Sequence, residues 1–532
     1  MDAPTVWHCK VKASVALVVC LAVLSYVVAA QQAPDSAPGA SLTIHKTTHL
    51  VVLDVVVTDQ SGRAVNSLAP DSFTVLEDGV AQKIVSFENP ESHYNKTLQQ
   101  RGVGNLEGNP DSTPRNILVI DELNTDPING ARARDAVKKY LRAQRSPLRQ
   151  PTALLILGNH GLTLLQSYTT DHKKLAQAMA AHKPELPWHL LHAEGVRGAG
   201  WRFGMMVRAL EQIAQASVNR SARKNVIWLS TGYPVLSLTH MFGSDIEKLN
   251  GLITALSKML MESRISVYTI DPSGISGNTE SEPSGRTPFG FFGGSSLVNG
   301  ALIFERIAPE TGGKICHLRN DISDCIGDDA VDGASYYTLA YYPSNANWNG
   351  KFRHIAVKVN ATGIRARTRL GYFAVSDPEG ISDAQIDFTL SMAVTNPITY
   401  IAVPFGVAGK HLTTPDQAEL TFKIDQSGLW WSKTSDGGSR TEITLVTAGI
   451  NRDEKVLGYK VREFEVTLPK PKKSKSDKGP VVLKVVVDVP PKADRIRCVV
   501  RDAQTDHLGT IDLQPDTLTV TPLSQEQPSE AN

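Results

Sequence analysis

The sequence has almost no net charge. Its 532 residues include 55 lysines and arginines and 54 aspartates and glutamates, which gives a formal charge of +1. A protein that binds nucleic acid or an acidic membrane surface through its overall charge has a clear basic excess. We therefore expect neither as the partner. The basic segment 469–480 is consistent with this, because no aromatic residues that could stack on bases lie between its lysines.

Familiar catalytic motifs are absent as well. The sequence has no Gly-x-Ser-x-Gly nucleophile elbow, and Thr-Gly-Gly-Lys at 311–314 lies between a predicted helix and a predicted strand, the wrong context for a phosphate loop. The histidine pairs in segments 45–49 and 188–195 lack the glutamate that a zinc-protease helix has between its histidines. We therefore expect that the protein is not an enzyme.

Long apolar runs are missing except at the N-terminus. There a basic segment, 8–12, precedes an apolar stretch, 13–30, that ends in small residues. This layout is typical of a secretory signal peptide, residues 1–30, although an uncleaved membrane anchor has a similar length. Because the polar linker 31–41 follows directly, we expect cleavage and no membrane span in the mature chain. The mature protein is then secreted, periplasmic or at the cell surface.

Cleavage would leave three cysteines. Cys316 and Cys325 could close a short loop as a disulfide, which an oxidising compartment permits. Two free thiols are the alternative, and a zinc site needs more ligands than these cysteines and His317. We predict the disulfide. Cys498 lies in an apolar segment and is expected to be a buried strand residue.

Two regions of the mature chain have β patterns only. Residues 42–90 contain apolar strands and an Asp78-Gly79 hairpin signal, and a polar linker, 91–114, follows. Residues 380–522 contain short strands separated by turn signals, as in a β-sandwich. A disordered tail, 523–532, is expected to end the chain.

Between these β regions, residues 115–375 alternate apolar strands with helices. The strand candidates are NILVIDE (116–122), TALLILGN (152–159), NVIWLSTG (225–232) and RISVYTID (264–271). This alternation predicts an α/β fold with a doubly wound parallel sheet that helices cover on both faces. The Gly/Ser-rich insertion 273–300 is expected to be a mobile loop. Three β-only segments after residue 335 would extend the sheet or pack beside it.

Several segments occur in a specific order: DVVVTDQSGRAVNSLAPDSFTVLEDGVAQKIVSFE, ILVIDELNT, YTTDHKKLAQAM, KNVIWLSTGYP, ISVYTIDPSG and YYTLAYYP. In these residues the chain resembles the von Willebrand factor A-related proteins described from Acidobacteria. The resemblance covers roughly residues 45–375, and RIRCVVRDAQTDHLGTIDL is similar to the C-terminal part of such proteins. It implies a Rossmann-like von Willebrand A domain at 115–375, flanked by the N-terminal β module and the C-terminal β-sandwich.

The resemblance also implies a metal site at the strand ends. In metal-binding A domains the first strand ends Asp-x-Ser-x-Ser, a second loop supplies a Thr and a third strand ends in Asp, and these oxygens hold Mg²⁺ or a similar cation. Here Leu123 replaces the first Ser, segment 195–204 contains no Thr, and Thr231 takes the place of the Asp. The set is degenerate, and fewer charged ligands mean weaker binding. The residues implied for it are Asp121, Asn124, Thr125 and Thr231.

A structural role for Asp121 is the alternative, either as the cap of the helix that begins near residue 127 or as a link between the loops. Glu122 and Asp126 could compensate for the missing ligands, but Glu122 is expected to point away from Asp121, because successive strand residues point to opposite faces. We therefore expect no cofactor other than a weakly held divalent cation.

We expect an exported protein that acts by protein–protein interaction or adhesion, through the C-terminal end of the parallel strands around Asp121 and Asn159. The alternatives are an exported scaffold or regulatory subunit of an envelope hydrolase complex, and a purely structural envelope component.

Overall fold

The computed structural model describes residues 50–93, 113–187, 196–217, 222–232, 243–275, 301–375, 382–412, 416–469 and 479–520. The chain divides into two compact units, 1–48 and 49–532, and every described residue belongs to the second. The predicted signal peptide, the linker 31–41, the histidine segments 45–49 and 188–195 and the tail 523–532 lie outside the described residues. So do most of the linker 91–114, the insertion 273–300 and the basic segment 469–480. No helix in the described part of the chain is long and apolar enough to cross a membrane.

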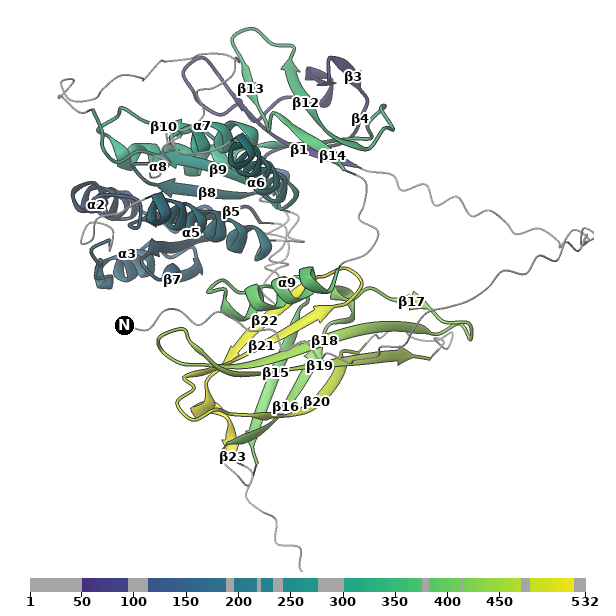
Figure 1. The fold of residues 1–532 in the computed structure, drawn as a ribbon. Helices are drawn as coiled ribbons and strands as arrows, with labels where there is room; N and C mark the ends of the chain where they lie inside the picture. Colours follow the sequence, from purple (N-terminus) through teal and green to yellow (C-terminus); the bar gives the residue numbers. More distant parts are fainter. Residues whose placement is uncertain are drawn as a thin grey trace, which may run out of the picture. The chain divides into compact units, whose positions relative to one another are not determined.

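A six-stranded sheet forms the centre of the α/β region (Figure 1). Its strands, in spatial order, are β10 (Ile315–Cys316), β9 (Ile265–Ile270), β8 (Lys224–Leu229), β5 (Arg115–Asp121), β6 (Thr152–Gly158) and β7 (Gly161–Thr169). All neighbouring pairs are parallel except β6 and β7. The four strands predicted between residues 116 and 271 are therefore confirmed. The edge strand β7 was not predicted.

Helices cover both faces of this sheet, because the strand β5 is apolar on both sides. Leu118 and Ile120 pack with α2 (Pro127–Ala143), α3 (His172–Ala181) and α8 (Ile322–Ala334). Ile117 and Val119 belong to the opposite cluster, which includes residues of α5 (Val196–Gln215), α6 (Gly243–Glu262) and α7 (Ala301–Glu310). The doubly wound arrangement predicted from the alternation of strands and helices is thus present.

The three β-only segments after residue 335 do not extend the central sheet. They pair with the N-terminal strands in two four-stranded sheets, β13-β1-β11-β4 and β14-β12-β2-β3. The strands are β1 (Val51–Thr58), β2 (Phe73–Glu77), β3 (Val80–Gln82), β4 (Ile84–Glu88), β11 (Tyr337–Tyr341), β12 (Asn349–Val359), β13 (Arg365–Arg367) and β14 (Gly371–Val375). The predicted boundaries, 42–90 for the β module and 115–375 for the α/β domain, therefore differ from the structure: the module comes from both sides of the α/β region.

Apolar burial explains this closure. Residues of β1, β2, β11, β12 and β14 share one apolar cluster, so the N-terminal strands alone would leave its other half exposed. The predicted Asp78-Gly79 hairpin is present between β2 and β3, with positive φ angles of 47° and 85° that suit a two-residue turn.

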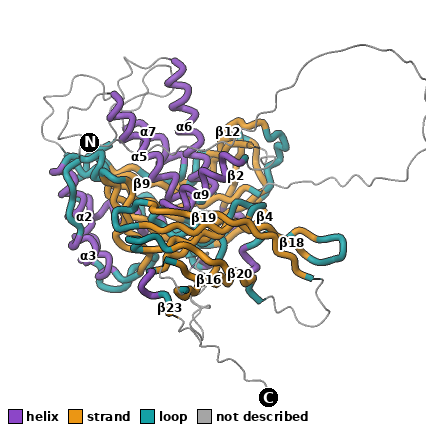
Figure 2. Tube along the Cα trace, turned by 60° about the horizontal axis from the view of Figure 1, so that its bottom comes forward, coloured by secondary structure: helices purple, strands orange, loops and turns teal. Residues whose placement is uncertain are grey.

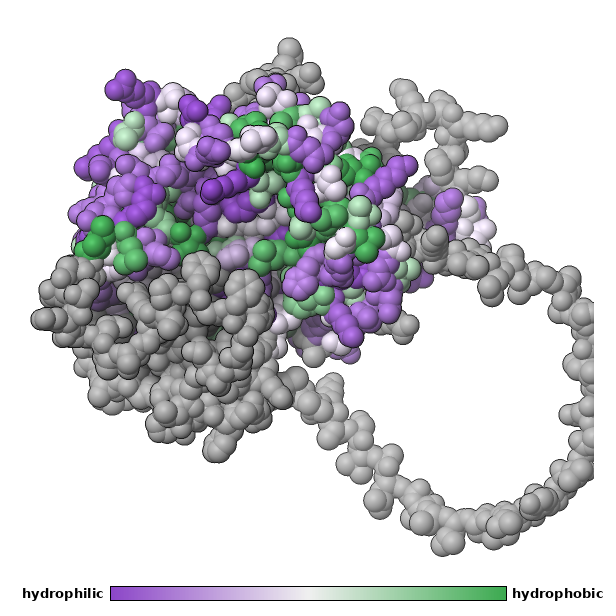
Figure 3. Space-filling model, turned by 90° about the horizontal axis from the view of Figure 1, so that it is seen from above, coloured by the Kyte–Doolittle hydropathy of each residue, from purple (hydrophilic) through white to green (hydrophobic). Residues whose placement is uncertain are grey.

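On the face of the protein seen in Figure 3, hydrophilic residues predominate among those described, with smaller hydrophobic groups between them.

The C-terminal region is a β-sandwich with its own apolar core. One sheet contains β15 (Phe405–His411), β16 (Gln417–Ile424), β20 (Val481–Asp488) and β23 (Thr519–Val520). The other contains β17 (Ser432–Lys433), β18 (Ser439–Ile450), β19 (Val456–Leu468), β21 (Arg495–Asp502) and β22 (Leu508–Leu513). The long strands β18 and β19 lie side by side in an antiparallel pair (Figure 2).

One of the short strands expected in 380–522, QIDFTLSMAV at 385–394, is wrong, because the helix α9 (Asp383–Thr395) occupies this segment. The Ser382 side chain caps the helix by accepting a hydrogen bond from the Gln385 amide. Leu390, Ala393 and Val394, at helical spacing, then join the apolar cluster that also contains residues of α5 and of β18. One face of α5 is thus covered within the chain.

A buried ion pair lies between the two sheets of the N-terminal module. Arg353 Nη1 lies 3.0 Å from Glu77 Oε1, and both side chains are at most 3% exposed. The hydroxyls of Tyr341 and Tyr372 donate to the other Glu77 oxygen, at 2.8 and 3.0 Å. The glutamate is therefore compensated by one guanidinium and two phenols.

We expect Arg353→Met to lower the free energy of unfolding by about 3–5 kcal/mol, because it leaves the Glu77 charge buried without its cation. Urea unfolding followed by circular dichroism would measure the loss. The control is Arg63→Met, which removes a pair with Asp59 in which the arginine is 82% exposed, and should cost far less. Equal losses in the two variants would contradict the assignment.

Candidate functional site

Asp121 ends the central strand β5 and is completely buried. Its carboxylate accepts hydrogen bonds from the Asn124 backbone N–H at 2.9 Å and from the Asn124 side-chain amide at 3.0 and 3.1 Å. Trp228 Nε1 and the Ser230 hydroxyl, at the end of β8, donate to Oδ2 at 3.3 and 3.2 Å. Neutral donors from two neighbouring strand ends therefore surround both carboxylate oxygens.

Asn124 connects this carboxylate to a positive charge. While its amide nitrogen donates to Asp121, its side-chain oxygen accepts from Arg202 Nη1 of α5 at 3.0 Å. Arg202 is itself buried, at 7% exposure. The predicted ligand segment 195–204 is thus helical from Val196 onward, and it supplies a guanidinium to the site.

The two threonines link the loops that follow β5 and β8. The Thr231 hydroxyl donates to the Asn124 carbonyl at 3.2 Å, and the Thr231 amide donates to the Thr125 hydroxyl at 3.3 Å. The structure therefore brings together all four residues that the sequence implied for the site, Asp121, Asn124, Thr125 and Thr231. Their contacts described here are with protein groups, and a role as metal ligands stays a prediction.

Burial raises the pKa of Asp121 to about 6. The hydrogen bonds from Asn124, Trp228 and Ser230 act in the opposite direction but offset only part of this effect. The cause is that the buried carboxylate loses the water that would solvate it, while the described donors that replace this water are neutral. Asp121 is therefore a carboxyl group that changes its charge near neutral pH.

The acidic residues on either side of Asp121 have other partners. Glu122 points to the opposite face, where Arg134 Nη1 lies 2.6 Å and His182 Nε2 lies 3.0 Å from its carboxylate. Asp126 caps α2 by accepting hydrogen bonds from two backbone amides of the first turn. The cap is therefore Asp126, and of the two structural roles considered for Asp121 the structure shows the link between the loops.

These contacts fit a divalent cation poorly. Asp121 is the one carboxylate in the group, and the guanidinium of Arg202, one amide away, would repel a second cation. In the described ranges, no three His, Cys, Asp or Glu side chains lie close enough together to hold a metal ion. A hard cation prefers several charged oxygen ligands, which this arrangement does not supply.

Three residues of the site were missed from the sequence. Arg202 lies in segment 195–204, where the family motif predicts a threonine. Nothing in the sequence around Arg202 indicates its contact with Asn124. Ser230 stands beside Thr231 in the same strand end, so the motif comparison could have included it. Trp228 gave no signal, because a tryptophan inside a buried strand is usually a core residue.

Other predicted residues lie apart from this group. The Asn159 amide, after β6, donates to Glu185 Oε2 at 3.3 Å and to the Leu186 carbonyl at 3.0 Å. In the structure a disulfide joins Cys316 to Cys325, with their Cα atoms 6.4 Å apart, and ties β10 to α8. The thiol Cys498 is buried in β21, and burial raises its pKa.

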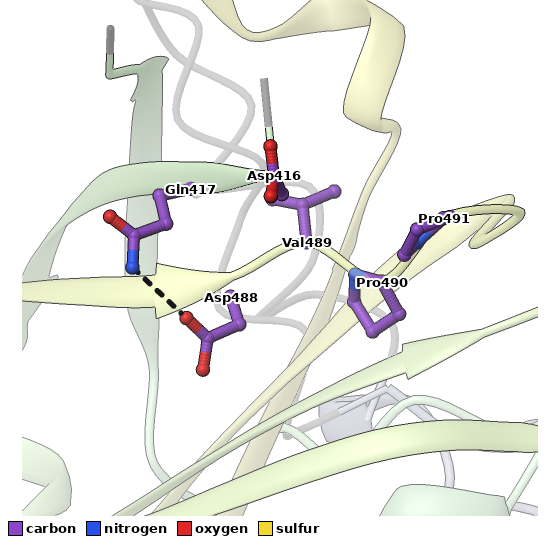
Figure 4. Close-up of a pocket in the computed structure, with 6 residues that line it drawn as sticks. All are labelled: Asp416, Gln417, Asp488, Val489, Pro490 and Pro491. Atoms are coloured by element: carbon purple, nitrogen blue, oxygen red, sulfur yellow. Dashed lines mark hydrogen bonds between the residues drawn. The ribbon is translucent and has the colours of Figure 1, made fainter. Parts of the chain in front are cut away.

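A hollow of about 410 Å³ lies in the C-terminal sandwich, at the ends of β16 and β20 (Figure 4). Its lining residues are Asp416, Gln417, Asp488, Val489, Pro490 and Pro491. The Gln417 amide donates to Asp488 at 3.3 Å. The charged groups among these lining residues are the two carboxylates, Asp416 and Asp488, and none of the lining side chains is cationic.

No protein-family model and no curated protein matches the sequence. Among solved structures, an aerotolerance-related membrane protein from Bacteroides fragilis is 14% identical, with 41% of this chain and 98% of that chain covered and a TM-score of 0.25. The SpRpn10 VWA domain is 13% identical, with 40% and 93% covered and a TM-score of 0.21. These scores are too low to bear on the fold or the function of this chain.

We expect Asp121→Asn to alter how stability depends on pH. The pKa of Asp121 is about 6 in the folded state against an ordinary value of 3.8, so the folded state binds more protons between these values. The free energy of unfolding therefore falls as pH rises from about 4 to 6, and this one group accounts for about 3 kcal/mol of the fall. The asparagine variant lacks that loss.

Urea unfolding of both proteins across this pH range would measure the difference between their free energies of unfolding. The difference should shift in favour of the variant as pH rises. The control is Asp71→Asn at an exposed residue, for which the difference from the wild type in the free energy of unfolding should not change with pH. A flat difference for Asp121→Asn as well would contradict the raised pKa.

Proposed function

We propose that this chain is a protein-binding module of the von Willebrand A type that works without a bound metal ion. The observation that supports it is the chain of contacts from Asp121 through Asn124 to Arg202. In a metal-dependent site the cation orders the loops and leaves one position for a carboxylate of the partner. Here hydrogen bonds order the loops, and an arginine supplies the positive charge.

The surface beside the site supports binding of a protein. Trp201, next to Arg202 in α5, is 41% exposed. Tryptophan and arginine are the residues that most often dominate protein–protein interfaces. The C-terminal ends of parallel strands are also the usual place for ligand contacts in open α/β sheets. We infer that the partner contacts Trp201 and the loops after β5 and β8.

Export and the absence of catalysis are part of the same proposal. The signal-peptide pattern at 1–30 and the bond between Cys316 and Cys325 both suit a secreted, periplasmic or cell-surface protein. Adhesion or a related binding role would follow from such a location.

Metal independence can be tested by calorimetric titration of the mature protein with Mg²⁺ and Mn²⁺. We expect no heat of binding in the wild type or in Asp121→Ala, because Asn124, Trp228 and Ser230 already occupy the contacts around the carboxylate. Heat in the wild type that disappears in Asp121→Ala would show a metal site and overturn the proposal.

Partner binding can be tested by capture from envelope extracts in the presence of EDTA. We expect a captured protein whose affinity falls about tenfold or more in Trp201→Ala, because truncating a central tryptophan typically costs about 2 kcal/mol or more. The matched control is Trp430→Ala, a similarly exposed tryptophan in the sandwich. Capture that needs Mg²⁺, or equal losses in the two variants, would contradict the proposed surface.

A further inference from the structure

We propose that a single monoatomic anion, with chloride as the common example, binds in a small polar cavity beside Arg369 and Thr368, near the N-terminal end of the strand β9. The cavity lies between β1, the start of β9 and the connection from β13 to β14. It is separate from the site at Asp121, which lies at the opposite, C-terminal end of the parallel strands.

The size of the cavity limits its contents. Its volume is about 20 Å³, and a single water needs roughly 10–15 Å³ by such a measure. A water molecule or a monoatomic anion fits, while phosphate or sulfate does not.

Two donors that line the cavity have no partner. Arg369 Nε and the Thr368 hydroxyl are buried and make no hydrogen bond in the described part of the chain. Buried polar groups in native proteins are nearly always hydrogen-bonded, so such a pair indicates an occupant that accepts hydrogen bonds. Both residues line the same small cavity, so the proposed anion would accept hydrogen bonds from both.

The charges around the cavity favour an anion over water. Arg264 and Asp54 line it together with Arg369, and these two are paired with each other, which leaves Arg369 as the lining cation without an ion pair in the described part of the chain. Arg223 also acts on Asp54, although its own described hydrogen bonds are to neutral oxygens. The guanidinium groups of Arg264 and Arg223 thus act on the one lining carboxylate, while Glu88 acts on Arg264 and Glu262 on Arg369 from outside the lining.

Arg369 carries the least compensated of these charges. Burial lowers its pKa, with the nearby charge of Arg264 adding to the effect and Tyr341 and Asp54 opposing it. A water molecule would satisfy the hydrogen bond of Nε but would leave this charge buried. A chloride ion supplies both the acceptor and the missing negative charge.

Such an anion would also join two parts of the fold. Arg369 and Thr368 belong to the N-terminal β module, whereas Arg264 immediately precedes β9 of the central sheet. An anion held between them adds to the Asp54–Arg264 pair, which makes the same connection.

The test measures the thermal unfolding temperature of the full chain in sodium chloride and in sodium gluconate at equal ionic strength. For the wild type we expect the temperature to rise with chloride and to level off, as binding to the folded state alone requires. Arg369→Gln should lose this chloride dependence. Thr368→Val, which keeps the charge and the shape, should need about tenfold more chloride, since it removes one hydrogen bond to a charged group.

The control is Arg365→Gln, which removes an exposed arginine of β13 and should keep the wild-type response. Bromide-soaked crystals of the wild type should show an anomalous peak next to Arg369 Nε. Equal unfolding temperatures in chloride and gluconate, a cavity that contains water in bromide crystals, or loss of the response in the control would each overturn the proposal. If Arg369→Gln does not fold, Thr368→Val and the bromide peak decide the question.

Discussion

The burial of one carboxylate at the end of the central strand determines how the C-terminal edge of the sheet is built. Asp121 is removed from water, so its lone pairs must be satisfied by protein donors. Asn124 supplies two of these donors, and Trp228 and Ser230 supply the others from the neighbouring strand. The loop after β5 is thereby fixed to the end of β8. The orientation of the Asn124 amide then places its oxygen toward α5, where Arg202 meets it.

Charged side chains are buried at both ends of the same sheet, but the groups that compensate them differ. At the C-terminal end the Asp121 carboxylate is held by neutral groups. At the N-terminal end ion pairs of both polarities connect the β module to the α/β region: Asp54 of β1 pairs with Arg264, and Arg367 of β13 pairs with Asp332 of α8. One of these pairs uses the N-terminal strand β1 and the other uses β13, which follows the α/β region in the sequence. The module therefore needs strands from both sides of the α/β region to make both contacts.

The sequence predicted which segments form strands and helices better than it predicted which strands pair with one another. The central strands were recognisable because parallel strands buried on both faces are continuously apolar, whereas β7 at the edge has a mixed pattern. The module strands were also recognised, but Val51 pairs with Tyr341, almost three hundred positions away, and no local pattern carries that information. The α9 segment was misassigned although Ser382 offered a helix-cap signal. At the site, the motif comparison identified Asp121 and its loop, while Arg202 depends on a tertiary contact that no spacing reveals.

The charge at the site sets what kind of recognition it can perform. A divalent cation on one aspartate leaves a net positive centre that attracts an acidic side chain strongly. The pair of Arg202 and Asp121 has a net charge near zero when the Asp121 carboxyl is ionised and a charge of +1 when it is protonated. Because the pKa of Asp121 is raised to about 6, the change between these two states occurs close to neutral pH. Such a site gains little from long-range attraction. In the proposed binding role, its affinity would come mainly from apolar contact and shape, for which the exposed ring of Trp201 beside Arg202 is suited.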